Sequence, residues 1–353
     1  MKKRKGMKLP AAIAIIAVCT GLSFLLGYLF TGSAGLMSLT SEENERNIAL
    51  AEFAGRLQKG DIEGLFENAQ KLTPTMDSKA SYDEKLLNIL SAYDPETLQV
   101  LHNEEGEYRL YADDTYIAPI DVVTEEDGFR ISIPIHGEKT CIVEVPAGLK
   151  ISANGQQIGS DKIIEKNVDA SNFEQVRETQ YIPKVDLYEL DGLIGMPDLQ
   201  ADNGKTYALI EDPITGHLLM GEEVTDSELL QTVIDDAILL AKFPAQEATL
   251  GEVSNVALTS SSWYNGRYTG VQNYWFTAHA KSEFSNEKVL KAVSQGEDSF
   301  AAHVVFDYFA DNGEVHRTWH IGYQLTMVNT PNGWKIAATA INNELNPGTI
   351  IPE

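Results

Sequence analysis

Two histidines and an aspartate near the C-terminus have the spacing of a small chemical site. His316 and His320 follow an Asn-Gly turn signal at 312–313, and Asp307 precedes it. If 312–313 form a two-residue hairpin turn, Asp307 lies opposite Thr318 and on the same sheet face as both histidines. Neutral imidazoles and a carboxylate around one point suit either a divalent metal or acid–base chemistry. The alternative is that all three are ordinary polar surface.

Aromatic side chains gather between residues 263 and 276 and form a second candidate site. Trp263 and Tyr264 lie beside Asn265-Gly266, as in a glycan-binding or peptide-binding loop, so we predict that they bind a ligand. Trp275 and Phe276 fall within an apolar run and are predicted to be core. For Trp263 and Tyr264 the alternative is also packing in the core.

Common catalytic and cofactor motifs are missing from the sequence. It has no G-x-S-x-G, H-E-x-x-H, C-x-x-C, P-loop or G-x-G-x-x-G pattern. Ser285-Asn-Glu-Lys288 matches the S-x-x-K of penicillin-recognising enzymes, but without its partner motifs we interpret it as a coincidence. We therefore expect no cofactor, and a protein without catalytic activity is favoured over an enzyme.

The elements that position these residues belong to a C-terminal α+β domain, predicted over 222–345 and followed by a tail at 346–353. Thr225-Asp-Ser-Glu228 is a capping box, and an apolar stripe with helical spacing follows it. Strands are predicted over 271–280, 300–309, 315–328 and 334–341, with hairpin signals at 311–313 and 332–333.

Two further blocks precede this domain. Residues 42–137 predict an α+β domain, with helices near 50–57, 62–69 and 81–92 and strands near 97–102, 107–112, 116–123 and 129–135. Within it, Gly60 is predicted to end one helix and Asp61 to cap the next. Residues 138–212 show strands and tight turns, which predicts a small β module that depends on its neighbours.

The N-terminal region predicts a membrane anchor. Residues 9–30 form a run of 22 residues without a charged side chain, roughly 33 Å long as a helix. A basic tail at 1–8 precedes the run and a short uncharged tether at 31–41 follows it, so we expect a cytoplasmic N-terminus and an extracellular ectodomain. A cleaved signal peptide ending near Gly32-Ser33-Ala34, and a lipoprotein signal at Cys19, are the alternatives.

The charge of the chain limits its partners. It contains 27 Lys and Arg against 52 Asp and Glu, and five of the cations precede the apolar run. The ectodomain therefore carries a net charge of about −30, which disfavours nucleic acid and anionic lipid. We expect the membrane as one partner, through the single helix, and an envelope protein or wall component as another. Oligomerisation stays open.

These patterns resemble a known class of proteins. A leading amphipathic helix, the corner Lys59-Gly60-Asp61-Ile62 and a trailing meander are similar to the NTF2-like α+β cone fold, as is the last block with its 332–336 segment NGWKI. The segments EVPAG (144–148) and ISANG (151–155) are similar to small β repeats of TcaA-like, single-pass envelope proteins of Gram-positive bacteria. The resemblance implies a non-catalytic envelope role in binding or structure, such as wall homeostasis, and it transfers no site residues. The alternative is an NTF2-like enzyme or small-ligand-binding protein that uses the cone pocket of the last domain.

Overall fold

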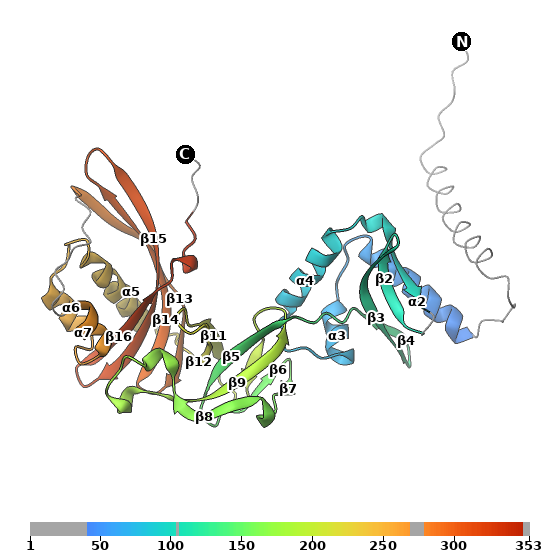
Figure 1. Cartoon of the computed structure of the whole chain (residues 1–353), viewed down its shortest axis with the longest axis horizontal. Helices are drawn as coiled ribbons and strands as arrows, with labels where there is room; N and C mark the ends of the chain where they lie inside the picture. Colours follow the sequence, from blue (N-terminus) through green and yellow to red (C-terminus); the bar gives the residue numbers. More distant parts are fainter. Residues whose placement is uncertain (1–40, 104–105, 269–278, 349–353) are drawn as a thin grey trace, which may run out of the picture.

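The computed structural model describes residues 41–103, 106–268 and 279–348, and these form three modules in series. The modules have a mixed α+β structure with mainly antiparallel strands, which confirms the predicted class. Ser41 and the C-terminal module lie at opposite ends of the molecule (Figure 1). Among the residues described, no helix is long and apolar enough to cross a membrane. The predicted anchor (9–30) and residues 31–40 of the predicted tether lie outside them.

The first module packs three helices on one face of a four-stranded meander. The helices are α2 (Ser41–Leu57), α3 (Leu65–Leu72) and α4 (Lys79–Ser91), and the strands, in sheet order, are β1 (Leu98–His102), β2 (Tyr108–Ala112), β3 (Thr115–Glu125) and β4 (Gly128–Ser132). Every helix and strand predicted for this block is present. The capping role predicted for Asp61 is wrong: its carboxylate pairs with Arg56 at 2.8 Å and accepts the Glu63 N–H in the turn that precedes the helix. Helix α3 instead begins after Gly64, which has a φ of 77°.

A buried aspartate joins the first module to the second. Asp77, in the loop between α3 and α4, is 0% exposed. Its Oδ1 accepts the backbone N–H of Ile194 at 2.7 Å and of Gly195 at 3.0 Å, and its Oδ2 accepts the Thr75 hydroxyl at 2.7 Å. Asn154 donates to the carbonyls of Thr75 and Asp77 from the other side. The two modules are therefore held by polar contacts that water does not reach.

Replacing this aspartate is expected to loosen the joint. In Asp77→Ala the N–H groups of Ile194 and Gly195 stay buried without an acceptor, which should cost about 2 kcal/mol of unfolding free energy. Urea unfolding measures that loss, and hydrogen exchange should become faster at residues 194–195. Asp191→Ala is the control, because Asp191 forms only an exposed ion pair with Lys162 and should cost less than about 1 kcal/mol. Equal losses in the two variants would contradict the role of Asp77.

The middle module consists of strands and short turns. Its strands are β5 (Lys139–Pro146), β6 (Ile151–Ala153), β7 (Gln156–Gln157), β8 (Ile163–Asp169), β9 (Lys184–Leu193), β10 (Leu199–Ala201), β11 (Tyr207–Glu211) and β12 (Leu218–Glu223). Strands β10, β6 and β7 form a small sheet of their own, while β12, β5, β9 and β8 continue the sheet of the C-terminal module. Strand β12 lies beyond the predicted end of the module at residue 212.

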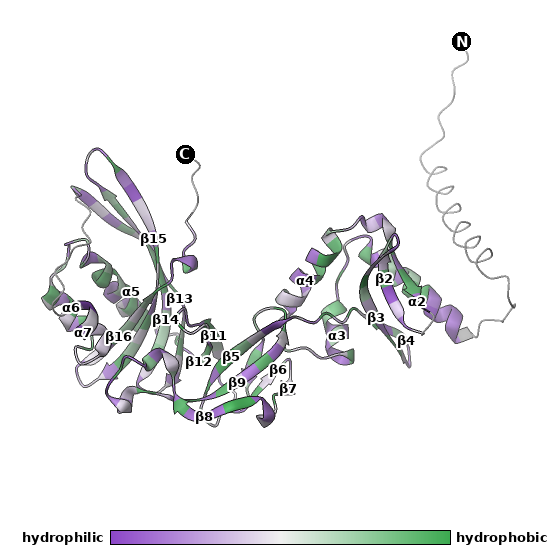
Figure 2. Ribbon diagram, viewed as in Figure 1, coloured by the Kyte–Doolittle hydropathy of each residue, from purple (hydrophilic) through white to green (hydrophobic). Residues whose placement is uncertain are grey.

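The C-terminal module places three helices against a strongly curved antiparallel sheet. The helices are α5 (Ser227–Lys242), α6 (Leu250–Val256) and α7 (Ser262–Tyr268), and the strands are β13 (Lys281–Gly296), β14 (Ser299–Asp311), β15 (His316–Thr330) and β16 (Gly333–Ile341). Helix α5 is capped by Asp226 and not by the predicted Thr225, because the Asp226 carboxylate accepts two N–H groups of the first turn. The hairpin of β14 and β15 projects beyond the helices, and its tip is mainly hydrophilic (Figure 2).

The middle and C-terminal modules share one sheet across a short seam. Strand β12 pairs with β13 only at Glu222–Ser294 and Glu223–Val293. The backbones approach so closely there that a Cβ on Gly221 would lie 2.6 Å from the Ser294 carbonyl oxygen. Glycine is therefore required at position 221 for the two sheets to join.

Buried polar side chains hold the middle module against the outer face of this sheet. Glu144 is 0% exposed, and its carboxylate bonds His217 Nδ1 at 2.7 Å and the Ser171 N–H at 3.0 Å within the middle module. Gln295 of β13 donates to the Glu144 backbone carbonyl at 3.3 Å and so connects the two modules. Nearby, Gln324 donates to Asp212 at 2.9 Å and contacts His303 Nε2 at 3.0 Å. Burial lowers the pKa of His303, although these contacts oppose the shift.

Candidate functional site

The structure brings together two of the three residues predicted to bind a metal. His320 lies directly opposite Asp307, and Nδ1 of the imidazole is 2.7 Å from Oδ1 of the carboxylate. The predicted pairing of Asp307 with Thr318 is wrong by two residues, because the hairpin loop spans four residues. In that loop the Asn312 side chain accepts the N–H groups of Glu314 and Val315. A shift of two residues keeps the same sheet face, so the predicted side remains correct.

Asp307 is oriented by side chains from three parts of the chain. Besides His320, Asn286 donates to Oδ2 at 2.8 Å and Asn346 donates to Oδ1 at 3.1 Å. Asn286 occupies a β-bulge with a φ of 58°, which turns its amide toward the carboxylate. Burial raises the pKa of Asp307, but these hydrogen bonds outweigh burial, and the pKa is lowered. The imidazole is thus held through Nδ1, while a Cβ on Gly348 would lie 2.3 Å from its Nε2.

This network predicts a pH-dependent effect of Asn286. Because the folded pKa of Asp307 is lowered, its ionised carboxylate adds stability that is lost as the pH falls through that pKa. Asn286→Gly keeps the left-handed backbone and removes only the donor, so we expect a loss of about 1 kcal/mol at pH 7 and a smaller loss at pH 3. Urea unfolding at both pH values tests this. Asn265→Gly is the control, because its amide donates to the backbone carbonyls of Thr259 and Ser261. A loss in Asn286→Gly that does not depend on pH would contradict the role of Asp307.

His316 lies apart from this pair. It pairs with Asp311 at the exposed end of the hairpin and contacts the Phe309 ring at 6.3 Å. Among the residues described, no group of three or more His, Cys, Asp or Glu side chains could hold a metal ion. The three predicted ligands therefore do not form one site.

Trp263 and Tyr264, which were predicted to bind a ligand with core packing as the alternative, are packed in the core. Both belong to helix α7 and face the sheet, with 5% and 7% exposure. Trp263 Nε1 donates to the Thr339 hydroxyl at 3.1 Å, and the Tyr264 hydroxyl is 2.5 Å from that of Ser254. Their apolar surface thus fills the core, which places them away from an external ligand. Trp275 and Phe276 lie outside the described residues.

The concave face of the C-terminal sheet is largely filled by side chains. Phe300 and Phe306 from β14 and Tyr268 from α7 pack there with the aromatic residues described above. One buried carboxylate, Asp236 of α5, lies in this region at 8% exposure. Burial raises its pKa to about 7, and the charge of Lys335 opposes the rise. Asp236 is not one of the residues that line the open hollow at the end of this face.

A hollow of about 220 Å³ remains open at one end of the concave face. Tyr308, Trp319, Ile321 and Tyr323 line it on the sheet side, and Ala241, Pro244 and Ala245 line it at the end of α5. The Tyr308 and Trp319 rings are stacked, with centroids 5.6 Å apart and planes 24° apart. The Tyr308 hydroxyl donates a hydrogen bond to Glu247 at 2.7 Å. Burial is the main cause of a raised Tyr308 pKa, and the hydrogen bond to Glu247 adds to the rise. The hollow can therefore accept a small apolar ring.

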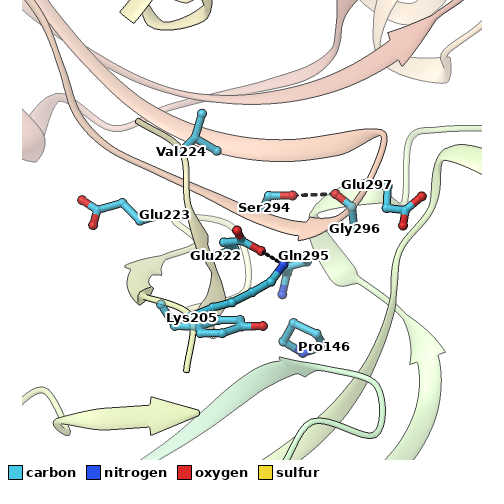
Figure 3. A pocket seen from close by; sticks show the side chains of 10 residues that line it. Pro146, Lys205, Glu222, Glu223, Val224, Ser294, Gln295, Gly296 and Glu297 are labelled. Carbon is cyan, nitrogen blue, oxygen red and sulfur yellow. Dashed lines mark hydrogen bonds and ion pairs between the residues drawn. The ribbon is translucent and has the colours of Figure 1, made fainter. Parts of the chain in front are cut away.

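A second hollow, of about 420 Å³, lies at the seam of the two modules (Figure 3). Lys205 crosses it to reach Glu222, with Nζ and Oε2 2.5 Å apart, and Ser294 donates its hydroxyl to the Gly296 carbonyl. Glu223 and Glu297 are the other charged residues of its lining. Because the Lys205–Glu222 pair is about half exposed, it contributes at most about 1 kcal/mol.

The aromatic hollow was not predicted from the sequence. The strand alternation places Tyr308 and Trp319 on the inner face of the sheet. The same alternation is expected of core residues, so it does not indicate a hollow. Helices α6 and α7, which close the concave face, were also missed. For α6 a signal was present, since Thr249 and Glu252 form a complete capping box.

Comparisons with known proteins place the chain in no established family. No family model matches it, and no curated protein sequence is similar to it. Among solved structures, an "Ntf2 like protein involved in plasmid conjugation" is similar at 12% identity over 52% of this chain and 68% of that chain, with a TM-score of 0.25.

Proposed function

We propose that this chain is a membrane-anchored, non-catalytic binding protein of the bacterial cell envelope, with NTF2-like outer modules and a TcaA-like layout. The observation that carries the proposal is the serial arrangement. The predicted anchor precedes Ser41, and the C-terminal module lies at the far end of the molecule (Figure 1). A buried joint at Asp77 and a shared sheet connect the modules. Such an arrangement holds the C-terminal module away from the membrane surface.

Protease treatment of intact protoplasts tests this topology. A C-terminal epitope on the full chain should be removed by external protease, while an epitope on residues 1–8 is protected. The mass of the mature protein should include residues 1–34 if the anchor is retained. A variant with Ile16→Arg and Leu22→Arg is the control, because two charges disfavour insertion of the run. A protected C-terminal epitope in the parent chain would contradict the proposal.

A crosslinking pulldown from intact cells addresses the partner. The expected result is an envelope protein or a wall fragment that is enriched with the parent chain and absent with the double-arginine variant. Equal capture by both chains would mean that anchoring is not needed for binding.

A second candidate function is binding of a small ligand at the C-terminal module. The aromatic hollow favours it, because stacked rings stand opposite small alanine side chains there. An enzyme would need a group in this hollow that titrates near neutral pH. Tyr308 and Tyr323 line the hollow, but burial raises their pKa values, and Asp236, whose pKa is raised to about 7, does not line it. Ligand binding in this hollow is compatible with a membrane-anchored protein.

A further inference from the structure

An aromatic row crosses three strands beside the hollow. Phe284, Tyr308 and Trp319 are direct partners in the register of β13, β14 and β15. The ring centroids are 4.8 Å apart for Phe284 and Tyr308 and 5.6 Å apart for Tyr308 and Trp319. The row offers a flat apolar surface, and the hollow at its Trp319 end is smaller than a typical drug-sized pocket. A ligand of one or two fused rings fits this space.

Cations surround the row although the chain is strongly acidic. Lys242 Nζ lies 5.5 Å from the centre of the Phe284 ring, and the Arg317 guanidinium lies 5.3 Å from that of Trp319. The charge of a third cation, Arg267, acts on Tyr323. Burial raises the pKa of Tyr323 to about 12, and the charge of Arg267 opposes that rise. None of the three cations lines the hollow itself, but each acts on an aromatic side chain of the row or of the hollow, in a chain with a net charge of −25.

The protein offsets these cations only in part, because the charge of Lys242 acts on Glu252 without forming a salt bridge. Within the described ranges, Lys242, Arg267 and Arg317 form no salt bridge, whereas most other ion pairs of the chain join a lysine or arginine to a neighbouring carboxylate. The carboxylate at the hollow, Glu247, is already bonded to the Tyr308 hydroxyl and to His279 Nε2 at 3.0 Å. The local charge is therefore positive and available to an incoming anion.

The geometry points to an anion with a planar apolar body, such as an aromatic carboxylate, as the ligand of this hollow. Its rings stack on Trp319 and Tyr308, and its carboxylate pairs with Arg317 or Arg267 at the rim. An arginine guanidinium can hold a carboxylate through two parallel hydrogen bonds while it stays against an aromatic ring. A neutral ring would gain only the stacking, and a cationic ring would be repelled. The inference rests on the ligand-binding role proposed for the C-terminal module.

A charge series on one ring system tests the inference. The full chain, in nanodiscs of neutral lipid, is titrated with 2-naphthoate, 2-naphthamide and 2-naphthylmethylammonium by calorimetry, with empty nanodiscs as the blank. The carboxylate should bind about fivefold or more tightly than the amide, and the ammonium should bind weakest. Added salt should weaken only the carboxylate. Equal affinities for the three probes, or tightest binding of the ammonium, would overturn the inference.

Variants locate the site. Arg317→Gln should lower naphthoate affinity about fivefold and leave naphthamide affinity unchanged. Trp319→Leu should weaken binding of both ligands. Lys166→Gln, which removes an exposed cation on β8, is the matched control and should change neither. Arg317 is exposed, so its replacement should leave the melting temperature unchanged. If no probe binds while external protease still removes the C-terminal epitope, the ligand class is wrong and the anchored topology stands.

Discussion

The Asp236→Asn variant is expected to be more stable than the parent chain at pH 8, by about 2–4 kcal/mol. Asp236 is buried in α5, and burial raises its pKa to about 7, from the 3.8 of an unperturbed aspartate. Since the folded pKa is the higher one, ionisation removes stability as the pH rises from about 4 through 7. Asparagine has nearly the same shape as a protonated aspartate and does not ionise, so its advantage should shrink below about 1 kcal/mol at pH 4.

Urea unfolding of the C-terminal module between pH 4 and pH 8 measures this difference. Asp235→Asn is the matched control: this carboxylate is exposed and accepts a hydrogen bond from Gln231, and its charge is a smaller cause of the raised Asp236 pKa than burial. The control should differ from the parent by less than about 0.5 kcal/mol at either pH. A constant difference between Asp236→Asn and the parent at all pH values would show that ionisation is not the cause.

His217→Ala is expected to destabilise the chain by about 3 kcal/mol. The substitution leaves the fully buried Glu144 carboxylate with the Ser171 N–H as its remaining donor. A buried charge that loses its partner keeps its desolvation cost without compensation. If the charge is also removed, in Glu144→Gln with His217→Ala, part of the loss should be recovered.

Chemical unfolding of the parent, the single variant and the double variant measures their free energies of unfolding and tests this prediction. Lys205→Ala is the comparison, since its ion pair with Glu222 lies at the surface and should contribute less than about 1 kcal/mol. A His217→Ala loss no greater than that of Lys205→Ala would contradict a structural role for the buried pair.

The sequence is sufficient to predict helices and strands in which apolar residues recur at a regular spacing along the whole element. In α5, Val233, Ala237 and Ala241 follow the helical spacing and are buried as expected. In the first module, each predicted helix and strand is present because its apolar residues face one core. Local periodicity decides these elements, so no information from distant residues is needed.

Elements whose pattern is short or interrupted were not predicted. Helices α6 and α7 have seven residues each, too few for a helical period to stand out. Strand β13 contains several charged residues and register shifts, so its alternation is broken. It begins at Lys281, after the strand that was predicted over 271–280, most of which lies outside the described residues.

The candidate site depends on side chains that the sequence alone does not place. The register of the β14–β15 hairpin follows from hydrogen bonds of the Asn312 side chain, and these move His320 opposite Asp307. Asn286 and Asn346 reach the same carboxylate from positions 21 and 39 residues away. Contacts over such separations leave no periodic signal in the sequence.

The route of the chain through the shared sheet sets an order of assembly during synthesis. The first module draws its helices and sheet from residues 41–132, so it can fold as soon as this segment has emerged. Strand β5, in contrast, pairs with β12 about 75 residues later, and β12 then pairs with β13 about 70 residues later still. The middle strands must therefore wait for the end of the chain before their sheet is complete. Until β13 arrives, the edge of β12 next to Gly221 is unpaired and exposed to other chains.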